Sequence, residues 1–584
     1  MAETLLSPGV LSRENDTSQI VNTPAPIGAA LIGPTVKGQP NVPKLVTSFN
    51  QYLTYFGGAF ISGSGNQGNN YTYFTSTAAF NYFQNGGTSL WVTRVVTGSS
   101  DFLAATSSFI ATGSAGGPTG YPVNTSPFIL QTLSYGANQN SSSSLDASGS
   151  LQSGSADNIR WQITSANTSS GTFTLLIRRG NDTTNQPVVL ETWTNLSLDP
   201  TQPNYIEKAL GNQIFGVGDS SNTFISASGN FPNRSNYVTV QKVNFTTPNY
   251  LTNTGVPKDI YTGSIPANQS GSFGGASGSL FIGGANYYQN ITAANIQGLN
   301  PTDYATAISL MSNADEYQYN VIIAPGLAYA DATGRTQLTN LINNTQNRGD
   351  NIAVIDLVRY GQAIETVTST ANNLDTSYAA SYWPWLQTVD PITGEFTWVP
   401  ASTMIPGVYV NNDNLTAPWF APAGLNRGGI INAVRAERKL TNANRDTLYQ
   451  NKVNPLATFP GTGVVVYGQK TLQTQASALD RVNVRRLLIA LKTRIGEIAN
   501  NLVFEQNTIA TRNSFLSQVN PYLAAVQQQQ GLYAFKVIMD DSNNSAETID
   551  RNQLIGQIYL QPTKTAEFIY LDFNILPTGA TFPA

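Results

Sequence analysis

The chain has 584 residues, of which 40% are hydrophobic and only 11% are charged, with 30 Lys and Arg against 34 Asp and Glu. It contains no Cys and no His, which excludes disulfides, thiolate-ligated zinc and every Ser–His or Cys–His nucleophile pair. The net charge of −4 is too small and too mixed to attract nucleic acid or an anionic membrane. We therefore expect a large multidomain protein with no cofactor, no metal and no direct nucleic-acid partner.

The N-terminal residues 1–24 are polar and without pattern, and they contain prolines at positions 8 and 24, with another just beyond at 26. Such a stretch cannot bury a core of its own, so it predicts an extended arm that a partner orders. The chain starts without the basic and apolar regions of a signal peptide, and no run of 18 uninterrupted apolar residues occurs. These features predict synthesis in a cytoplasm and no membrane span.

Residues 25–100 predict a small α/β segment, with a buried strand at 27–33, a strand at 44–47 that leads into a helix ending near 56–58, and a strand at 89–96. Between 101 and 300 the composition changes to short β-like runs separated by Ser, Gly and Asn tracts. Strands are expected there at 172–178 and 188–193, and a short helix at 204–210. This part is expected to be inserted, mainly β material.

After position 300 the pattern changes again, to a helix ending near 313, a strand at 320–325, a helix at 333–347 and a strand at 351–358. Strand, helix and strand at this spacing predict a parallel βαβ unit. The turn sequence Asp-Pro-Ile-Thr-Gly at 390–394, between two alternating runs, predicts a hairpin.

The fold class expected from these patterns is α+β and multidomain. Residues 301–565 form a C-terminal α/β core domain, to which 25–100 contribute the N-terminal part. Residues 101–300 form one or more inserted mainly-β outer domains, and residues 1–24 and 566–584 are extended arms.

A long helix is predicted from about residue 480, because apolar residues recur at alternate steps of four and three. The stripe consists of Val484, Leu488, Leu491, Ile495, Ile498 and Leu502. The opposite side carries Arg485, Arg486, Lys492 and Arg494. A second helix is expected at 507–529, followed by strands at 554–560 and 567–573.

Two glycine-rich runs imitate nucleotide-binding motifs. The run at 63–68 has the dinucleotide-binding spacing but lacks the following helix, and the run at 463–471 differs from a P-loop by one residue and reads as a strand. Paired carboxylates could run glycosidase chemistry, but those in the sequence are scattered, as at Asp540 and Asp541. We expect no enzymatic activity.

The N-terminal segments Ser-Pro-Gly-Val at 7–10, Pro-Ile-Gly-Ala-Ala-Leu-Ile-Gly at 26–33 and Trp-Val-Thr-Arg at 91–94 occur in this order along the chain. Together with further segments downstream, they resemble the tail sheath proteins of contractile phages and related injection systems. More specific examples are Tyr-Trp-Pro-Trp at 382–385, Ala-Pro-Trp-Phe-Ala-Pro-Ala-Gly-Leu-Asn-Arg at 417–427, Arg-Val-Asn-Val-Arg-Arg-Leu at 481–487, Val-Phe-Glu-Gln-Asn at 503–507 and Ala-Glu-Phe at 566–568. About 101–170 and 220–300 carry no such resemblance.

The resemblance implies a virion-tail protein, assembled in the host bacterial cytoplasm, that polymerises into a helical sheath around an inner tail tube and contracts. Its expected partners are further copies of itself, the tube protein, and baseplate and tail terminator proteins. The alternatives are another virion structural protein, such as a capsid or tail-fibre protein, or a virion glycosidase.

Two sets of residues are expected to make these contacts. Residues 1–24 and the region from about 554 to 584 should link neighbouring copies by adding strands to an open sheet edge, with Pro8, Gly9 and Val10 at one end and Phe568, Tyr570 and Phe573 at the other. Arg485, Arg486, Lys492 and Arg494 are candidates for holding an acidic inner tube. Alternatively, these four lie on a solvated helix face with local pairing, for example of Arg494 or Lys492 with Glu497.

Overall fold

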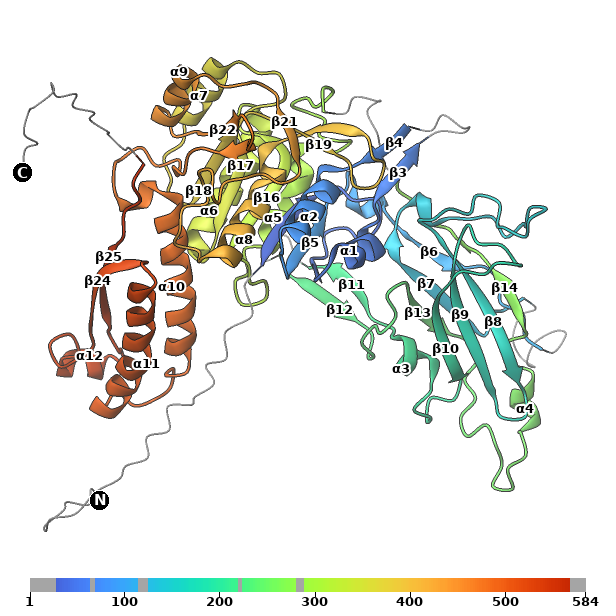
Figure 1. Ribbon diagram of the computed structural model, residues 1–584. Helices are drawn as coiled ribbons and strands as arrows, with labels where there is room; N and C mark the ends of the chain where they lie inside the picture. Colours follow the sequence, from blue (N-terminus) through green and yellow to red (C-terminus); the bar gives the residue numbers. More distant parts are fainter. Residues whose placement is uncertain (1–27, 63–68, 114–123, 219–222, 280–287, 568–584) are drawn as a thin grey trace, which may run out of the picture.

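The computed structural model describes residues 28–62, 69–113, 124–218, 223–279 and 288–567. Within these ranges the chain builds three hydrophobic cores: one around a large central sheet, one inside the inserted β segment and one in the C-terminal part. Figure 1 shows an elongated molecule, with the inserted β region at one end, the C-terminal helices at the other and the central sheet between them. The protein is therefore a mixed α/β protein, as its sequence predicts.

An eight-stranded sheet occupies the centre, in the order β2-β5-β1-β16-β17-β18-β22-β23. The strands are β1 (Ala29–Gly33), β2 (Lys44–Val46), β5 (Leu90–Arg94), β16 (Val321–Ala328), β17 (Ile352–Asp356), β18 (Ala379–Trp383), β22 (Asn454–Phe459) and β23 (Gly463–Val466). From β5 to β22 the neighbours run parallel, whereas β2 and β23 are antiparallel edge strands. Since β1 pairs with both β5 and β16, residues before and after the inserted segment share one sheet.

Helices cover this sheet: α1 (Phe49–Phe56), α2 (Phe74–Gln84), α5 (Tyr304–Leu310), α6 (Ala332–Arg348), α7 (Ile364–Asn372), α8 (Ile405–Leu415) and α9 (Asn442–Gln450). Every residue of β1, β16, β17 and β18 is buried, which is typical of parallel strands covered on both faces. Helix α6 joins β16 to β17 and packs on both, which confirms the predicted βαβ unit.

A small antiparallel sheet stands beside the central one and contains β19 (Leu386–Val389), β20 (Phe396–Val399) and β21 (Ala433–Ala436). The turn between β19 and β20 is held by Asp390, whose carboxylate accepts hydrogen bonds from the backbone N–H groups of Ile392 and Thr393 at 2.8 and 3.2 Å. Gly394 has φ +75°, a conformation that favours glycine. The predicted hairpin is confirmed.

The inserted segment folds into two four-stranded antiparallel sheets, β10-β9-β8-β14 and β13-β7-β6-β15. Their strands are β6 (Ala104–Ser107), β7 (Phe128–Tyr135), β8 (Ile159–Asn167), β9 (Thr172–Arg179), β10 (Val189–Ser197), β13 (Val238–Val243), β14 (Gln269–Gly271) and β15 (Phe273–Gly274). One core joins both sheets, and Phe128 stacks on Phe173 across it with ring centroids 5.5 Å apart. Short elements complete this region: α3 (Ile206–Leu210), β11 (Ile214–Val217), β12 (Ile225–Ser228) and α4 (Asp259–Thr262).

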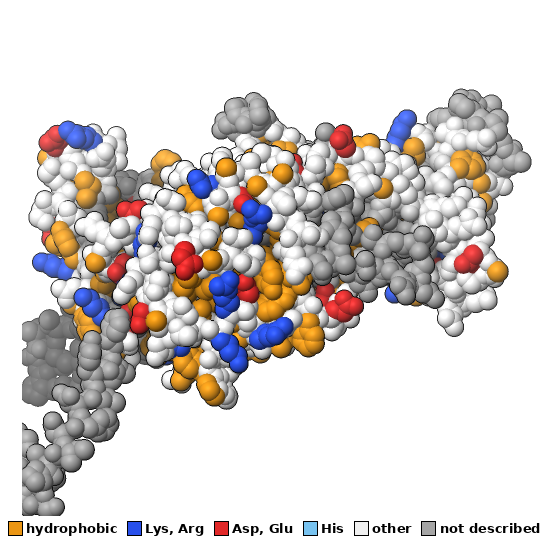
Figure 2. Space-filling model, turned by 90° about the horizontal axis from the view of Figure 1, so that it is seen from above, with side chains coloured by type: hydrophobic (Ala, Val, Ile, Leu, Met, Phe, Trp, Pro, Cys, Tyr) orange, Lys and Arg blue, Asp and Glu red, His pale blue; other side chains and the backbone are white. Residues whose placement is uncertain are grey.

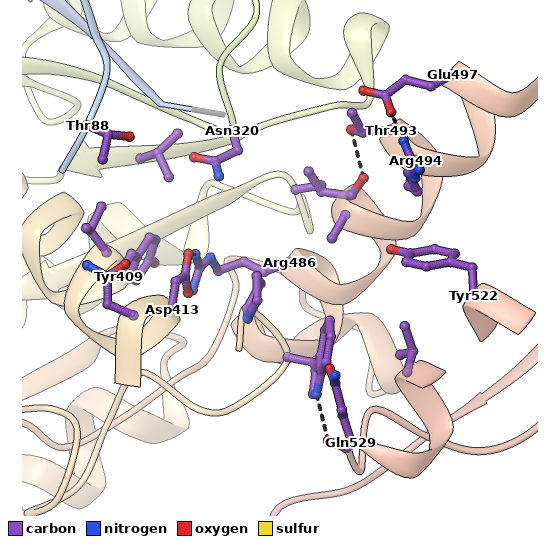
Figure 3. A pocket seen from close by; sticks show the side chains of 18 of the residues that line it. Thr88, Asn320, Tyr409, Asp413, Arg486, Thr493, Arg494, Glu497, Tyr522 and Gln529 are labelled. Carbon is purple, nitrogen blue, oxygen red and sulfur yellow. Dashed lines mark hydrogen bonds and ion pairs between the residues drawn. The ribbon is translucent and has the colours of Figure 1, made fainter. Parts of the chain in front are cut away.

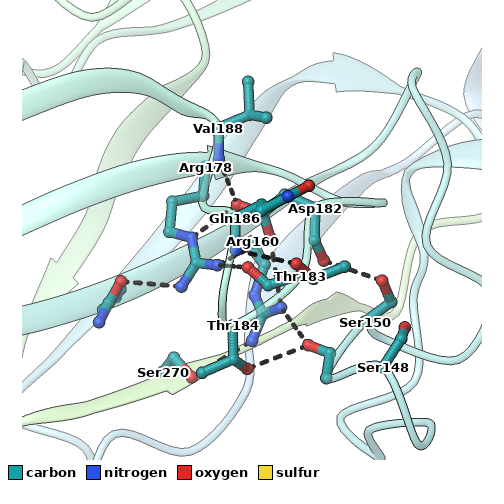
Figure 4. A network of polar contacts seen from close by, with 12 residues as sticks. Ser148, Ser150, Arg160, Arg178, Asp182, Thr183, Thr184, Gln186, Val188 and Ser270 are labelled. Atoms are coloured by element: carbon teal, nitrogen blue, oxygen red, sulfur yellow. Dashed lines mark hydrogen bonds and ion pairs between the residues drawn. The ribbon is translucent and has the colours of Figure 1, made fainter.

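A buried charge network ties the loops of the inserted segment to its sheet (Figure 4). The Asp182 carboxylate accepts two hydrogen bonds from Arg178, at 2.7 and 2.9 Å, and one from the backbone N–H of Val188 at 2.9 Å. Arg160 also reaches Asp182, at 3.4 Å, and all three charged side chains are at most 3% exposed. One carboxylate therefore faces two buried guanidinium groups.

The C-terminal part contains α10 (Val482–Asn500), α11 (Ile509–Gln528), β24 (Leu532–Ile538), α12 (Ala546–Asp550) and β25 (Gln557–Pro562). Both predicted long helices are confirmed. Val484, Leu491 and Ile498 of the predicted stripe are buried, and Leu488, Ile495 and Leu502 are half-buried. The strand expected at 554–560 begins later, at Gln557, and the one expected at 567–573 lies outside the described residues except for Glu567.

Figure 2 shows the surface from above. Most of it is white, which means uncharged polar side chains or backbone, and basic and hydrophobic side chains are scattered over its middle. The low proportion of charged residues in the sequence is thus visible as a mostly neutral surface. A further short hairpin consists of β3 (Ala59–Ser62) and β4 (Asn69–Thr72).

Candidate assembly surfaces

The C-terminal part ends in a two-stranded sheet with free edges. β24 and β25 pair antiparallel with each other, and neither pairs with another strand among the described residues. Five successive pairs, from Ala534 with Gln561 to Ile538 with Gln557, are in regular register. A two-stranded sheet is marginal by itself, and regular free edges are templates for a further strand.

This pairing corrects one expectation. The sequence predicts that a strand from residue 554 onward reaches a neighbouring copy, but residues 557–562 are already paired within their own chain. One face of the sheet is held by α11, and apolar residues of both strands join the core there. The strands therefore form a receiving surface rather than a free arm.

Glu567, the last described residue, is held by three side chains. Its carboxylate accepts hydrogen bonds from Arg481 at 2.7 and 2.9 Å, from the Tyr449 hydroxyl at 2.7 Å and from Gln469 at 3.0 Å. Burial alone raises the pKa of Glu567, but these hydrogen bonds outweigh burial and lower the pKa below its ordinary value. The point at which residues 568–584 leave the described structure is therefore fixed by a charged cluster.

Arg481 and Glu567 belong to two separate family-like segments, and the sequence does not show that their side chains are in contact. They lie 86 positions apart, and only the folded chain brings them together. The residues proposed for the arms themselves, Pro8, Gly9 and Val10 together with Phe568, Tyr570 and Phe573, lie outside the described residues.

The predicted cationic side of the long helix is not one exposed surface. Arg485 and Arg486 are only 4% and 5% exposed. Arg485 lies over the Tyr378 ring at 4.0 Å and donates to the backbone oxygen of Ser377 at 3.2 Å. Arg486 lies over the Tyr409 ring at 4.5 Å and forms an ion pair with Asp413.

The expectation that all four basic residues face outward is therefore wrong for Arg485 and Arg486. The helix carries more buried surface than its apolar stripe indicates, because it packs on the central sheet region as well as on α11, and aromatic rings supply the partners for both guanidinium groups. Lys492 is exposed, and Arg494 pairs with Glu497 at 2.9 Å on the partly exposed side.

The turn between α10 and α11 presents an unusual apolar tip. Phe504 is fully exposed, at 102%, and has φ +73°, a region that bulky residues rarely adopt. Val503 and Ile509 beside it are 58% and 65% exposed. The sequence marked this turn only as part of a family-like segment, and its exposure could not be read from the pattern.

A groove of about 1100 Å³ separates α10 and α11 from α8 and the start of the central sheet. Figure 3 shows side chains from these elements converging on it, including Tyr409, Asp413, Arg486 and Tyr522. Two ion pairs, Asp413 with Arg486 and Arg494 with Glu497, neutralise the charged side chains that line it. The groove forms where the core of the central sheet meets the core of the C-terminal part, so no local sequence pattern predicts it.

The nucleotide-like run at 463–471 forms no phosphate site in the described structure. Gly463 has φ +80° and opens β23, whose three valines are buried in the sheet, and Lys470 donates to the Tyr449 backbone oxygen at 2.9 Å. This confirms the strand interpretation of that run, whereas residues 63–68 lie outside the described ranges. In the parts of the chain that the structure describes, no group of three or more Asp or Glu side chains could hold a metal ion, and no helix could cross a membrane.

Two protein-family models match this chain. The model of the phage tail sheath protein central domain matches residues 282–472, and that of the phage tail sheath C-terminal domain matches residues 474–576. Together they cover half of the chain. They include the central βαβ unit, the long helices and the two-stranded sheet.

The curated relatives that match the chain are also named tail sheath proteins. The tail sheath protein of Vibrio phage KVP40 is 41% identical over 210 residues, which are 36% of this chain and 31% of the relative. The tail sheath protein of Enterobacteria phage T4 is 36% identical over 230 residues, which are 39% of this chain and 35% of the relative. The matches thus span about a third of the length of these relatives.

A solved structure extends the likeness to the whole fold. The crystal structure of a sheath tail protein from Listeria innocua is similar with a TM-score of 0.52 and 10% identity, covering 92% of this chain and 95% of that one. At this identity the likeness concerns the fold alone. Combined with the two family models and the curated relatives, it leads to one conclusion: the chain belongs to the phage tail sheath family.

Proposed function

We propose that the chain is the structural subunit of a contractile tail sheath, which polymerises into a helical sheath around an inner tail tube and contracts to drive the tube through the host envelope. The observation that carries the proposal is the β24–β25 sheet, a folded and regular sheet whose edges have no partner strand among the described residues. A repeating contact that does not close on itself generates a helix of subunits. A free sheet edge supplies such a contact when a neighbour adds a strand to it.

The strands would come from the chain ends. Residues 1–24 and residues 568–584 both lie outside the described residues, and Glu567 fixes the origin of the second segment. Strand addition depends on the backbone more than on side chains, so it survives large rotations of a subunit while outer contacts exchange between two packings. Contraction then needs no nucleotide, because the energy lies in the packing of the subunits.

The regions have separate roles in this proposal. The central sheet and the C-terminal part form the sheath core, the inserted β region forms the outer part, and the arms connect copies. The chain is structural rather than catalytic. It works in the virion tail after assembly in the host cytoplasm, with further copies, the tube protein, and baseplate and tail terminator proteins as partners.

In this proposal the long helix α10 contacts the tube with its exposed side. Lys492 is exposed there and Arg494 is 32% exposed and paired with Glu497, whereas Arg485 and Arg486 serve the interior of the protomer. A cationic surface would hold an acidic tube until firing. Sheath–tube binding should then weaken severalfold between 50 and about 500 mM salt in the unmodified protein and lose that dependence in a Lys492→Gln, Arg494→Gln variant.

The test of the proposal is electron microscopy of the purified chain. Full-length protein should form hollow striated tubes, and a variant lacking residues 1–20 should remain folded, by circular dichroism, without forming long tubes. A matched control replaces residues 1–20 with a Gly/Ser segment of equal length. Closed shells, fibres or persistent monomers from the full-length chain would contradict the sheath function.

A further inference from the structure

The groove between the central sheet and the C-terminal helices lies where the described chain begins. Ala29, at the start of β1, is one of its lining residues, as are Thr88 and Asn320. The backbone is pinned at this point, because Asn320 donates to the Gly28 oxygen at 2.9 Å and Ala29 donates to the Ser89 oxygen at 3.2 Å. A Cβ on Gly28 would lie 1.9 Å from that Ser89 oxygen, so only glycine fits here. Residues 1–27 therefore enter the described structure at the wall of the groove.

The groove is neutral and mostly apolar. Val410, Pro418, Ile489, Pro521 and Val526 contribute apolar surface. The charged residues that line it are paired with one another, as described above. Its volume of about 1100 Å³ exceeds the roughly 300–1,000 Å³ of small-molecule sites, which favours a length of chain as its occupant.

Polar groups in the wall suit an extended backbone. The side chains of Asn414, Gln518 and Gln529 line the groove. Arg486 also lines it, is nine-tenths buried, and has one terminal nitrogen, Nη1, without a hydrogen-bond partner in the described structure. A backbone carbonyl is a fitting acceptor for that N–H group, because a second carboxylate would leave an unpaired negative charge in the groove.

The residues just before Gly28 have the matching chemistry. From Thr17 to Ile27 the sequence carries no charge, and residues 20–27 read Ile-Val-Asn-Thr-Pro-Ala-Pro-Ile. The two prolines favour an extended conformation for the residues that precede them. Eight extended residues reach about 28 Å, at ~3.3–3.6 Å each, and they begin beside the groove wall at Ala29.

We propose that residues 20–27 dock in this groove of their own chain, as an extended uncharged segment between α8 and the helices α10 and α11. Docking fixes the root of the N-terminal arm and sets the direction in which residues 1–19 leave the protomer. The docking itself does not depend on polymerisation. Its consequence for the arm rests on the proposed sheath function.

Engineered cysteines test the docking, since the chain has none of its own. One variant of the full-length protein carries Ala25→Cys with Ala490→Cys on the α10 wall, and a second carries Asn22→Cys with Ala525→Cys on the α11 wall. A disulfide requires Cα atoms within about 7 Å. After mild oxidation of unassembled protein, we expect more than half of the chains of at least one variant to form an internal disulfide, seen as a monomer on a non-reducing gel and as a linked peptide by mass spectrometry.

Two controls identify the occupant. Ala25→Cys with Lys492→Cys, on the side of α10 away from the groove, should cross-link at least fivefold less. A mixture of chains carrying Ala25→Cys alone and Ala490→Cys alone should give almost no disulfide dimers. Dimers in that mixture would show that a neighbouring copy's segment occupies the groove, and cross-linking of both double variants at the control level would show that the segment docks elsewhere; either result overturns the proposal. Electron microscopy of the same samples scores tube formation separately, so that failure of the sheath function is not confused with failure of docking.

Discussion

The inserted β region and the C-terminal part treat their sheet edges in opposite ways. In the inserted region the edge strands β14 and β15 are three and two residues long, and the edge strand β10 breaks register twice, between Val189 and Glu191 and between Trp193 and Leu196. Short and bulged edges block pairing with another chain. In the C-terminal part, β25 keeps register with β24 over five successive pairs and has an outer edge with no described partner.

Their polar groups differ in the same sense. Asp182 and its two arginines are satisfied almost entirely within the inserted region, whereas the C-terminal part exposes Phe504 and anchors the chain at Glu567. The inserted region is thus complete as a folded unit. The C-terminal part is folded, but its sheet edges have no partner strand among the described residues, as the proposed sheath function requires.

The largest effect on stability is expected from disrupting the buried charge network of the inserted β region. Asp182→Ala removes the carboxylate that Arg160 and Arg178 share and leaves two buried positive charges, which costs roughly 3–5 kcal/mol. We expect proteolysis to cut the inserted region first, while the central sheet stays protected. The exposed Asp259→Ala serves as the control and should leave the cleavage pattern unchanged. Equal resistance of the two variants would mean that the network is not what holds this region together.

The second test uses the buried Asp356 of the central sheet, which should make the stability of the protein depend on pH. Burial raises the pKa of Asp356 to about 6, although Ser402 donates two hydrogen bonds to its carboxylate. Because the folded pKa lies above the unfolded value of 3.8, the folded state holds the proton more firmly and stability falls as pH rises from about 4 to 6. Asp356→Asn cannot ionise, so its free energy of unfolding should gain about 2–3 kcal/mol over the unmodified protein between pH 4 and pH 7.

Thermal unfolding of both proteins at several pH values measures this gain, with Asp390→Asn as a control for the loss of a carboxylate in a turn. A difference between Asp356→Asn and the unmodified protein that stays constant across the range would show that the group has the same pKa in the folded and unfolded states.

A smaller effect on stability, but a clear one on assembly, is expected at Glu567. Glu567→Ala leaves Arg481, Tyr449 and Gln469 without their shared acceptor, yet the cluster lies at the end of the described chain and is partly exposed. We expect a loss of about 1 kcal/mol or less. Tubes should nevertheless become shorter by more than half in electron micrographs, because the C-terminal arm loses its fixed origin. Glu547→Ala, which breaks an exposed ion pair with Arg551, should leave tube length unchanged.

Local patterns in the sequence predicted elements well where one element's own residues decide its structure. Continuous apolar runs predicted β16 and β17, and the Asp-Pro-Ile-Thr-Gly turn predicted the β19–β20 hairpin. The sequence did not predict burial or contacts where a residue far away in the chain determines them. Arg485 and Arg486 read as solvated because the rings of Tyr378 and Tyr409, which cover them, lie more than 70 positions away. The groove and the Glu567 cluster likewise exist only once separate segments are packed together.

The smallest effect on stability is expected from relieving the backbone strain at Phe504, in the turn between α10 and α11. Phe504 holds a left-handed backbone conformation that suits glycine, and its fully exposed ring gains nothing from packing within the protomer. Phe504→Gly should therefore raise the free energy of unfolding by up to about 1 kcal/mol. Phe504→Ala removes the same ring but keeps the strained backbone, so it should not stabilise the protein. If the ring is retained for contact with another subunit, both variants should form fewer tubes, and normal tube formation by both would show that the exposed tip has no part in assembly.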